Sequence, residues 1–420
     1  MKLNLWLGLV LAVFFTTGCP PAQHEDSPKR NDDFQKAKTV IIPLSSYGYL
    51  RKLSLHLRGT LPSQNEYKVL AEALSENAQG FYLKQKVKEY LATPNHVFKM
   101  EDRLSELFSL LPETDPWETD SNDNPFRSSF KNNSLNILFR DLVKKNKSWD
   151  ELLTGKQYSI HPLKGFSLSI GDRLFYAHVA ADQLVEPTYD ERGIETTPPQ
   201  HIEFNKQDLR VAGAVTTGRF FDRYVTTALN KNRKRAAAIF KIFLCDDMRA
   251  SLPEPTENLD PIYDLIFPET ESQSGEPLPK LTEDVHGSHP DCKKCHYKLD
   301  PMGRNFEFSS AILSRFPSSG ALTYQDKNGS MVDISTKGLG DLAFSITQQE
   351  EYAECQVRHF WNWFIGSDVP LQGDRLREVI TQFEKVERKT NDFISYLVST
   401  DEFWSTGETM EEDNLRQRSL

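Results

Sequence analysis

The sequence has no basic cluster and no apolar segment long enough to span a membrane. These absences limit the classes of protein to which the chain can belong. Its 420 residues include 60 Asp and Glu against 50 Lys and Arg, a net charge of −10. Because this excess of negative charge repels a phosphate backbone, nucleic acid is not an expected partner. The apolar run at residues 5–15 is too short to cross a bilayer as a helix.

Familiar catalytic patterns are also missing. No Ser/His/Asp arrangement, glycine-rich phosphate loop or HExxH sequence stands out, and no repeat of solenoid period is present. Alternating apolar and polar residues, which are typical of half-buried strands, are few. No sequence motif therefore indicates catalysis, and an all-β fold is not expected.

Apolar residues at helical spacing recur through most of the chain. Ser63 and Glu66 have the spacing of a capping box, as do Ser148 and Glu151. Helical periodicity occupies residues 87–91, 104–111, 135–143, 172–185, 236–248, 339–346, 352–365, 374–386 and 392–397. The sequence predicts a mainly α fold. We expect the three charged residues 233–235 to form a solvated start to the helix at 236–248.

The first 19 residues predict export. Lys2 precedes the apolar run, and Thr16, Thr17, Gly18 and Cys19 follow it, which resembles the lipobox of bacterial lipoproteins apart from Thr16, where Leu is usual. Cleavage before Cys19 would leave a lipidated first residue, so a membrane is the expected partner through this anchor. We expect the bacterial cell envelope, the outer membrane rather than the inner, with the chain facing the periplasm or cell surface. An ordinary signal peptide cut nearby is the alternative.

Cys292, Cys295 and His296 form a C-x-x-C-H sequence, the attachment signature of a c-type haem. Two thiols one helical turn apart can add to the two haem vinyl groups, and the adjacent imidazole can bind the iron as proximal axial ligand. A zinc site would need two further ligands, and a disulfide between Cys292 and Cys295 would leave His296 unexplained. The sequence predicts one covalent haem c.

Residues 286–307, HGSHPDCKKCHYKLDPMGRNFE, resemble the C-x-x-C-H…D-P-x-G core of the Planctomycete-type cytochrome c-like proteins. Residues 210–217, 232–236 and 243–245 are similar to the module that precedes this core in the family. Its C-terminal module is similar to residues 352–358, 364–366, 374 and 397–403. The resemblance covers roughly residues 205–405 and, more weakly, residues 50–62 and 90–94. It implies an exported haem protein of the cell envelope, with no established reaction.

The sixth ligand of the iron is open between His286, Met331 and Met302, with His289 behind them and water or no ligand as the remaining alternative. Met302 lies six residues past His296, so its sulfur would have to pass round the haem edge on about 20 Å of extended chain. Met331 is 35 residues downstream and would raise the reduction potential. His286 occupies a position where the family also tends to have histidine. Core packing of both methionines is the competing interpretation.

The D-P-x-G sequence has a purely structural interpretation. Pro301 is expected to end the helix that carries His296, and Gly303 to permit the turn that follows. His289 is expected in a solvent-facing loop, and Glu307 as a solvated carboxylate.

Cys245 and Cys355 remain, and in an oxidising compartment a disulfide between them is the simplest prediction. Two buried free thiols are the alternative. Cys355 and His359 are four residues apart on one predicted helix, a spacing that suits a metal, although both lie on its apolar stripe and suit the core.

These predictions give a lipid-anchored monohaem protein that transfers electrons to or from an unidentified redox protein. The alternatives are a surface-binding or scaffold lipoprotein with structural haem or none, and a haem enzyme of peroxidase type. The expected parts are a signal peptide (1–18), a tether (19–33), a helical N-terminal region (34–200), a helical module (201–271), a haem module (272–338), a C-terminal helical module (339–405) and a polar tail (406–420).

Overall fold

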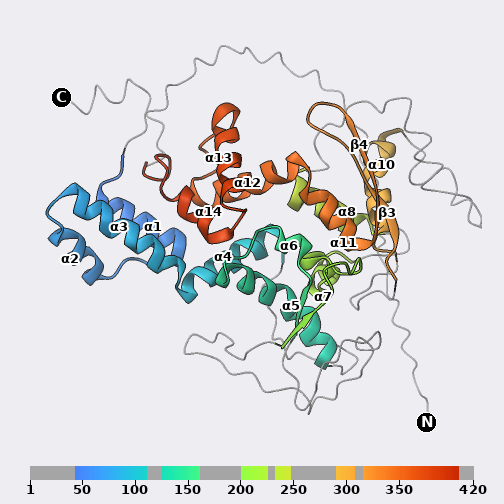
Figure 1. Cartoon of the computed structure of the whole chain (residues 1–420), viewed down its shortest axis with the longest axis horizontal. Coiled ribbons are helices and arrows are strands. Elements are labelled where there is room, and N and C mark those ends of the chain that lie inside the picture. Colours follow the sequence, from blue (N-terminus) through green and yellow to red (C-terminus); the bar gives the residue numbers. More distant parts are fainter. Residues whose placement is uncertain are drawn as a thin grey trace, which may run out of the picture. The chain divides into compact units, whose positions relative to one another are not determined.

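The computed structural model describes residues 43–110, 125–160, 200–225, 232–246, 290–307 and 316–405 (Figure 1). The predicted signal peptide with Cys19, the tether, the helix at 172–185, His286, His289 and the polar tail lie outside these residues. No helix in the described ranges is long and apolar enough to cross a membrane.

The prediction of a mainly α fold is confirmed, with thirteen α-helices in the described residues. They are α1 (Ser46–Arg58), α2 (Gln64–Glu72), α3 (Glu76–Leu91), α4 (Pro94–Leu107), α5 (Pro125–Lys144), α6 (Glu151–Thr154), α7 (Gly218–Arg223), α8 (Arg233–Leu244), α10 (Pro290–Arg304), α11 (Gly338–Thr347), α12 (Glu350–Phe364), α13 (Gly373–Lys385) and α14 (Thr390–Leu397). A 3₁₀ turn, η3, spans Gly213–Thr216. Strands β1 (Gln157–Ile160) and β2 (Gln200–Glu203) pair antiparallel, as do β3 (Ser319–Gln325) and β4 (Met331–Lys337).

One predicted capping box is confirmed and the other is wrong. The Ser63 hydroxyl accepts the Glu66 N–H, and the Glu66 carboxylate accepts the Ser63 N–H, so two exposed donors at the start of α2 are satisfied. Ser148 instead forms a β-bridge with Lys389, and α6 is a single turn whose N-cap, Asp150, makes no side-chain cap bond. The Asp150 carboxylate binds Arg388 at 3.0 Å, so a distant partner replaces the local cap.

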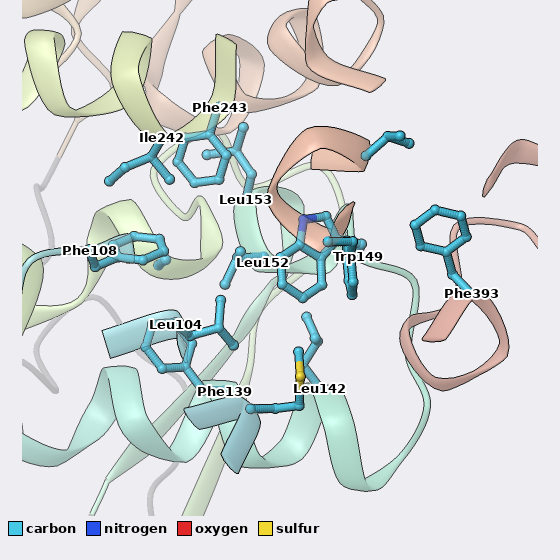
Figure 2. Close-up of a cluster of buried hydrophobic side chains, with 14 of the residues drawn as sticks. Leu104, Phe108, Phe139, Leu142, Trp149, Leu152, Leu153, Ile242, Phe243 and Phe393 are labelled. Carbon is cyan, nitrogen blue, oxygen red and sulfur yellow. The ribbon is translucent and has the colours of Figure 1, made fainter. Parts of the chain in front are cut away.

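Trp149 lies in the main core, among side chains from α4, α5, α6, α8 and α14 (Figure 2). Its ring is fully buried, and its Nε1–H donates to the Gln356 side-chain oxygen at 2.9 Å, so the one polar atom of the indole is satisfied. Phe360 of α12 packs edge-on against it with ring centroids 4.6 Å apart. The predicted N-terminal region and C-terminal module thus contribute to one apolar core.

The first and last described residues pair with each other. Pro43 and Ser405 form a β-bridge, and the Leu44 N–H donates to the Trp404 carbonyl at 2.7 Å. The buried Tyr49 hydroxyl donates to the Val398 carbonyl at 2.8 Å. Helix α1 is therefore held by the segment that follows α14.

The β3–β4 hairpin is absent from the predictions. Its ladder runs from Ser319 opposite Lys337 to Gln325 opposite Met331, and Gly329 adopts a left-handed φ of 81° in the turn. Three consecutive residues of β3, 322–324, are buried, which hides the alternation that marks a strand in sequence.

Gly320 allows β3 to approach the end of α10. A Cβ atom at this position would lie 2.6 Å from the Pro301 carbonyl oxygen and 2.4 Å from the Asn305 side-chain nitrogen. Because one of these atoms is backbone, we expect Gly320→Ala to lower the free energy of unfolding by roughly 1 to 3 kcal/mol in urea titration. Gly80→Ala in α3 is the matched control, since a Cβ atom there would have nothing within 4 Å and the substitution should stabilise by about 0.5 to 1 kcal/mol. Equal effects of the two substitutions would contradict the close approach.

Candidate functional site

Helix α10 carries all three residues of the C-x-x-C-H sequence, and it packs against β3 and α8 (Figure 1). Cys292 and Cys295 are separated by about one helical turn along it. Cys295 is half-buried against the apolar core, and 11% of the His296 side chain is exposed. The Cys292 side chain is outside the described part of the structure.

His296 faces a carboxylate on its own helix. Its Nδ1 lies 3.3 Å from Oδ2 of Asp300, four residues further along α10. The two groups meet the distance of an ion pair but not the alignment of a hydrogen bond. Because Nδ1 is directed toward Asp300, Nε2 is the ring nitrogen that suits a metal. This donor arrangement fits the proximal ligand of a haem iron.

Asp300 is in turn held by the first residue of α8. Arg233 approaches it as a fork, with Nε on Oδ1 and Nη2 3.1 Å from Oδ2. Burial alone would raise the pKa of Asp300, but the contacts with His296 and Arg233 outweigh it and hold that pKa below its usual value. The carboxylate therefore keeps its negative charge in a nearly buried position.

The prediction that residues 233–235 form a solvated helix start is wrong for both arginines. Only 12% of the Arg233 side chain and 4% of Arg235 are exposed, and the Arg235 guanidinium lies over the Phe221 ring at 4.1 Å. Lys234 alone is exposed. A planar guanidinium suits both a carboxylate and an aromatic face, which explains the burial of these charges.

A second ion pair joins the same two helices. Lys298 of α10 is 1% exposed and binds Asp246, just past the end of α8. The Lys298 ammonium also lies 5.5 Å from the centre of the Phe240 ring. Ion pairs near both ends of α8 thus hold it against α10. Neither ion pair was predicted, because the two helices are separated by some 45 residues of sequence.

The prediction that Pro301 ends the helix is wrong. α10 continues through Pro301 and Gly303 to Arg304, so Pro301 lies inside it. Proline in a helix removes one hydrogen-bond donor and is tolerated where tertiary packing compensates, here by α8 and β3. Glu307 is exposed, as expected.

The two candidate sixth ligands in the described residues, Met302 and Met331, make no described contact with His296, and His286 lies outside those residues. Met302 is fully buried in the core and lies six residues further along α10, about 9 Å along the helix axis. A side chain on the same helix is poorly placed to bind the opposite face of a haem held by His296. Met331 begins β4 and is 43% exposed.

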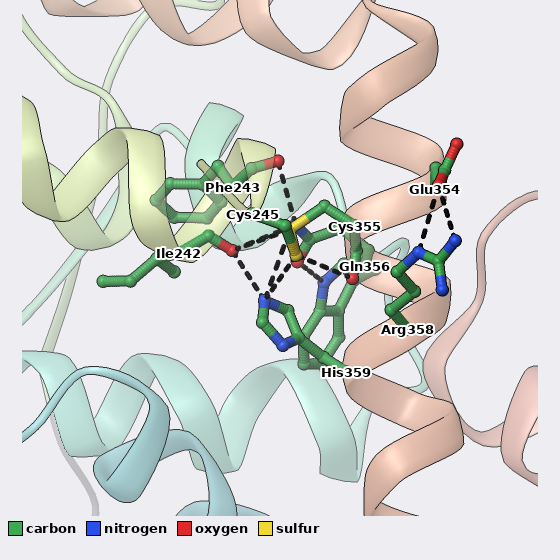
Figure 3. The surroundings of a disulfide bond; sticks show 9 residues. Ile242, Phe243, Cys245, Glu354, Cys355, Gln356, Arg358 and His359 are labelled. Carbon is green, nitrogen blue, oxygen red and sulfur yellow. Dashed lines mark hydrogen bonds and ion pairs between the residues drawn. A yellow bond between two sulfur atoms is a disulfide. The ribbon is translucent and has the colours of Figure 1, made fainter. Parts of the chain in front are cut away.

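The predicted disulfide between Cys245 and Cys355 is present and joins the end of α8 to α12, with Cα atoms 5.2 Å apart (Figure 3). The His359 Nε2 lies 2.9 Å from the Ile242 carbonyl oxygen and 3.4 Å from the Cys355 sulfur. Burial lowers the pKa of His359, which favours the neutral imidazole. Because the two sulfurs are bonded to each other, they offer no thiolate to a metal, and the packing of Cys355 and His359 in the core fits the structure better.

Gln356 adds to this junction between α8 and α12. Its side-chain nitrogen donates to the carbonyls of Ile242 at 3.2 Å and Phe243 at 3.1 Å, while its oxygen accepts from Trp149. It thereby satisfies carbonyls in the last turn of α8, which have no partner within the helix.

Comparison with protein-family models, with curated proteins and with solved structures finds no match.

Proposed function

We propose that the chain is an exported monohaem protein of cytochrome c type that transfers electrons at the bacterial cell envelope. Cys292 and Cys295 would form the thioether bonds, and Nε2 of His296 would bind the iron. The bound haem supplies a one-electron couple between ferric and ferrous iron. The polypeptide orients the imidazole, limits the access of water to it and sets the reduction potential of the iron.

One observation carries this proposal: the imidazole of a C-x-x-C-H sequence is held on a helix with its other ring nitrogen toward a buried, charge-compensated carboxylate. Histidine ligands of metals usually present their second nitrogen to such a partner. The lipid anchor on Cys19 would keep the protein at the membrane surface, where a redox protein partner can reach it. The predicted export agrees with this role, because haem c is attached outside the cytoplasm.

A second candidate, a surface-binding lipoprotein, is favoured by exposed apolar side chains in the first three helices and their connections. Leu61 is 59% exposed, Leu74 96% and Phe81 72%. Large apolar side chains of this kind often contact a partner protein. The same residues would serve the first proposal as a docking surface for the redox partner.

The test is the absorption spectrum of the full chain made in a host with haem c maturation machinery. We expect haem that survives acid–acetone extraction, its loss in the double variant Cys292→Ala/Cys295→Ala, and altered ligation in His296→Ala. The matched control is Lys294→Ala, which changes another residue of the same motif and should leave the spectrum unchanged. Wild-type protein that remains colourless would contradict the proposal and leave the surface-binding candidate.

A further inference from the structure

We propose that Asp300 and Arg233 form a tuning pair that sets the potential of the iron from behind His296. The inference rests on the proposed function, since it concerns the residue that would bind the iron. In it, Asp300 stabilises the oxidised state and Arg233 offsets part of that effect. Both are positioning residues, because each acts through the imidazole.

The first step concerns the ring. Asp300 lies on the Nδ1 side of His296, at 3.3 Å, and this side is opposite the nitrogen that would bind the iron. A negative charge there holds the proton on Nδ1, fixes the tautomer and makes Nε2 a stronger donor. Stronger donation favours ferric over ferrous iron and lowers the reduction potential.

The second step concerns the burial of these charges. Only 6% of the Asp300 side chain and 12% of the Arg233 side chain are exposed. Charges act over longer range in such surroundings than in water, so each can influence an iron on the far side of an imidazole. Arg233 contacts both carboxylate oxygens, including the Oδ2 atom that faces His296, and its positive charge opposes that of Asp300.

The third step distinguishes tuning from support. If the two residues only held α8 against α10, losing either would loosen the site in the same way. If they tune the iron, the two losses have opposite signs. Asp300→Asn leaves the positive charge of Arg233 and favours the ferrous state, whereas Arg233→Gln leaves the negative charge of Asp300 and favours the ferric state.

The Lys298–Asp246 ion pair provides the control. It joins the same two helices, its lysine is as deeply buried, and no described contact connects it to His296. Asp246→Asn therefore removes a bond between the same two helices and changes a charge that makes no described contact with His296 or Asp300.

The experiment measures the equilibrium between reduced and oxidised haem in the full, haem-loaded chain, at fixed ambient potential, by visible spectroscopy. We expect the ratio of reduced to oxidised protein to rise on the order of tenfold in Asp300→Asn and to fall in Arg233→Gln. Arg233→Lys, which keeps the charge, should return the ratio to that of the wild type, and Asp246→Asn should leave it within about twofold.

Shifts of the same sign in Asp300→Asn and Arg233→Gln, or shifts no larger than that of Asp246→Asn, would overturn the inference while the haem assignment stood. If Asp300→Asn does not fold, the comparison of Arg233→Gln with Arg233→Lys decides, since only a charge effect separates them in the expected direction. Wild-type protein without covalent haem would overturn the proposed function itself, and this result is visible before any potential is measured.

Discussion

The double variant Cys245→Ala/Cys355→Ala should unfold with a free energy roughly 4 to 5 kcal/mol below that of the oxidised wild type. The disulfide closes a loop of 110 residues. In the chain-entropy model, a cross-link of this span lowers the conformational entropy of the unfolded chain by the equivalent of that free energy. It also holds the end of α8 against α12 at the edge of the Trp149 core. Urea unfolding followed by far-ultraviolet circular dichroism measures the change.

Reduced wild-type protein separates the cross-link from the two sulfur atoms. It keeps both thiols in place, so its stability should fall nearly as far as that of the double variant, and the thioether bonds of a haem would survive the reductant. A double variant that unfolds within about 1 kcal/mol of the oxidised wild type would show that the unfolded chain gains little freedom from losing the bond.

Acidification from pH 7 to pH 5 should cost the folded protein about 4 kcal/mol, mainly through His56 and His96. Burial lowers the pKa of each to about 4 and is the largest cause, with the positive charge of Arg103 adding to it. The carbonyl of Trp363 beside His56 and the oxygens of Leu57 and Asn391 beside His96 oppose the shift without reversing it.

The sign follows from which state takes up protons first. An unfolded histidine has a pKa near 6.5, so below that pH the unfolded chain is protonated while the folded chain is not. Stability is therefore full above pH 7 and falls by about 2 kcal/mol per histidine by pH 5. Glu66, whose pKa is lowered to about 2, loses its contribution only below this window.

Substitution of the two histidines tests the assignment. His96→Gln should remove about half of the loss between pH 7 and pH 5, and His56→Gln/His96→Gln most of it, in urea titrations at the two pH values. The half-buried His359, whose pKa burial also lowers, contributes a remaining loss of the same sign. An unchanged pH dependence in the double variant would place the acid sensitivity elsewhere.

Local signals in the sequence predicted the local features of the fold. The capping box at Ser63 needs only residues within one turn, and the helices α11 to α14 follow from apolar periodicity, so both are confirmed. Ser148 carries the same local pattern but bonds to Lys389, because a tertiary contact outweighs a cap on a four-residue helix. The β3–β4 hairpin was not predicted, because the burial of its residues depends on packing against α10 and α8. Burial of this kind does not alternate along the strand, so the sequence shows no strand periodicity.

The candidate site divides in the same way. The C-x-x-C-H sequence is contiguous and can be read directly, and the disulfide follows from counting the remaining cysteines. Asp300 and Arg233 are 67 residues apart, and no local pattern in either segment indicates that they form an ion pair. Buried ion pairs depend on which surfaces of two helices face each other, and this is fixed only when the helices pack.

The pairing of Pro43 and Leu44 with Ser405 and Trp404 bears on when the chain can fold. A polypeptide that is synthesised amino end first cannot bury α1 against its final neighbours until the last of these residues has left the ribosome. Contacts that span so much of the sequence slow folding. During that interval, proteases and chaperones would compete with self-assembly for the incomplete polypeptide, and a stop codon before residue 398 would leave Tyr49 without its acceptor.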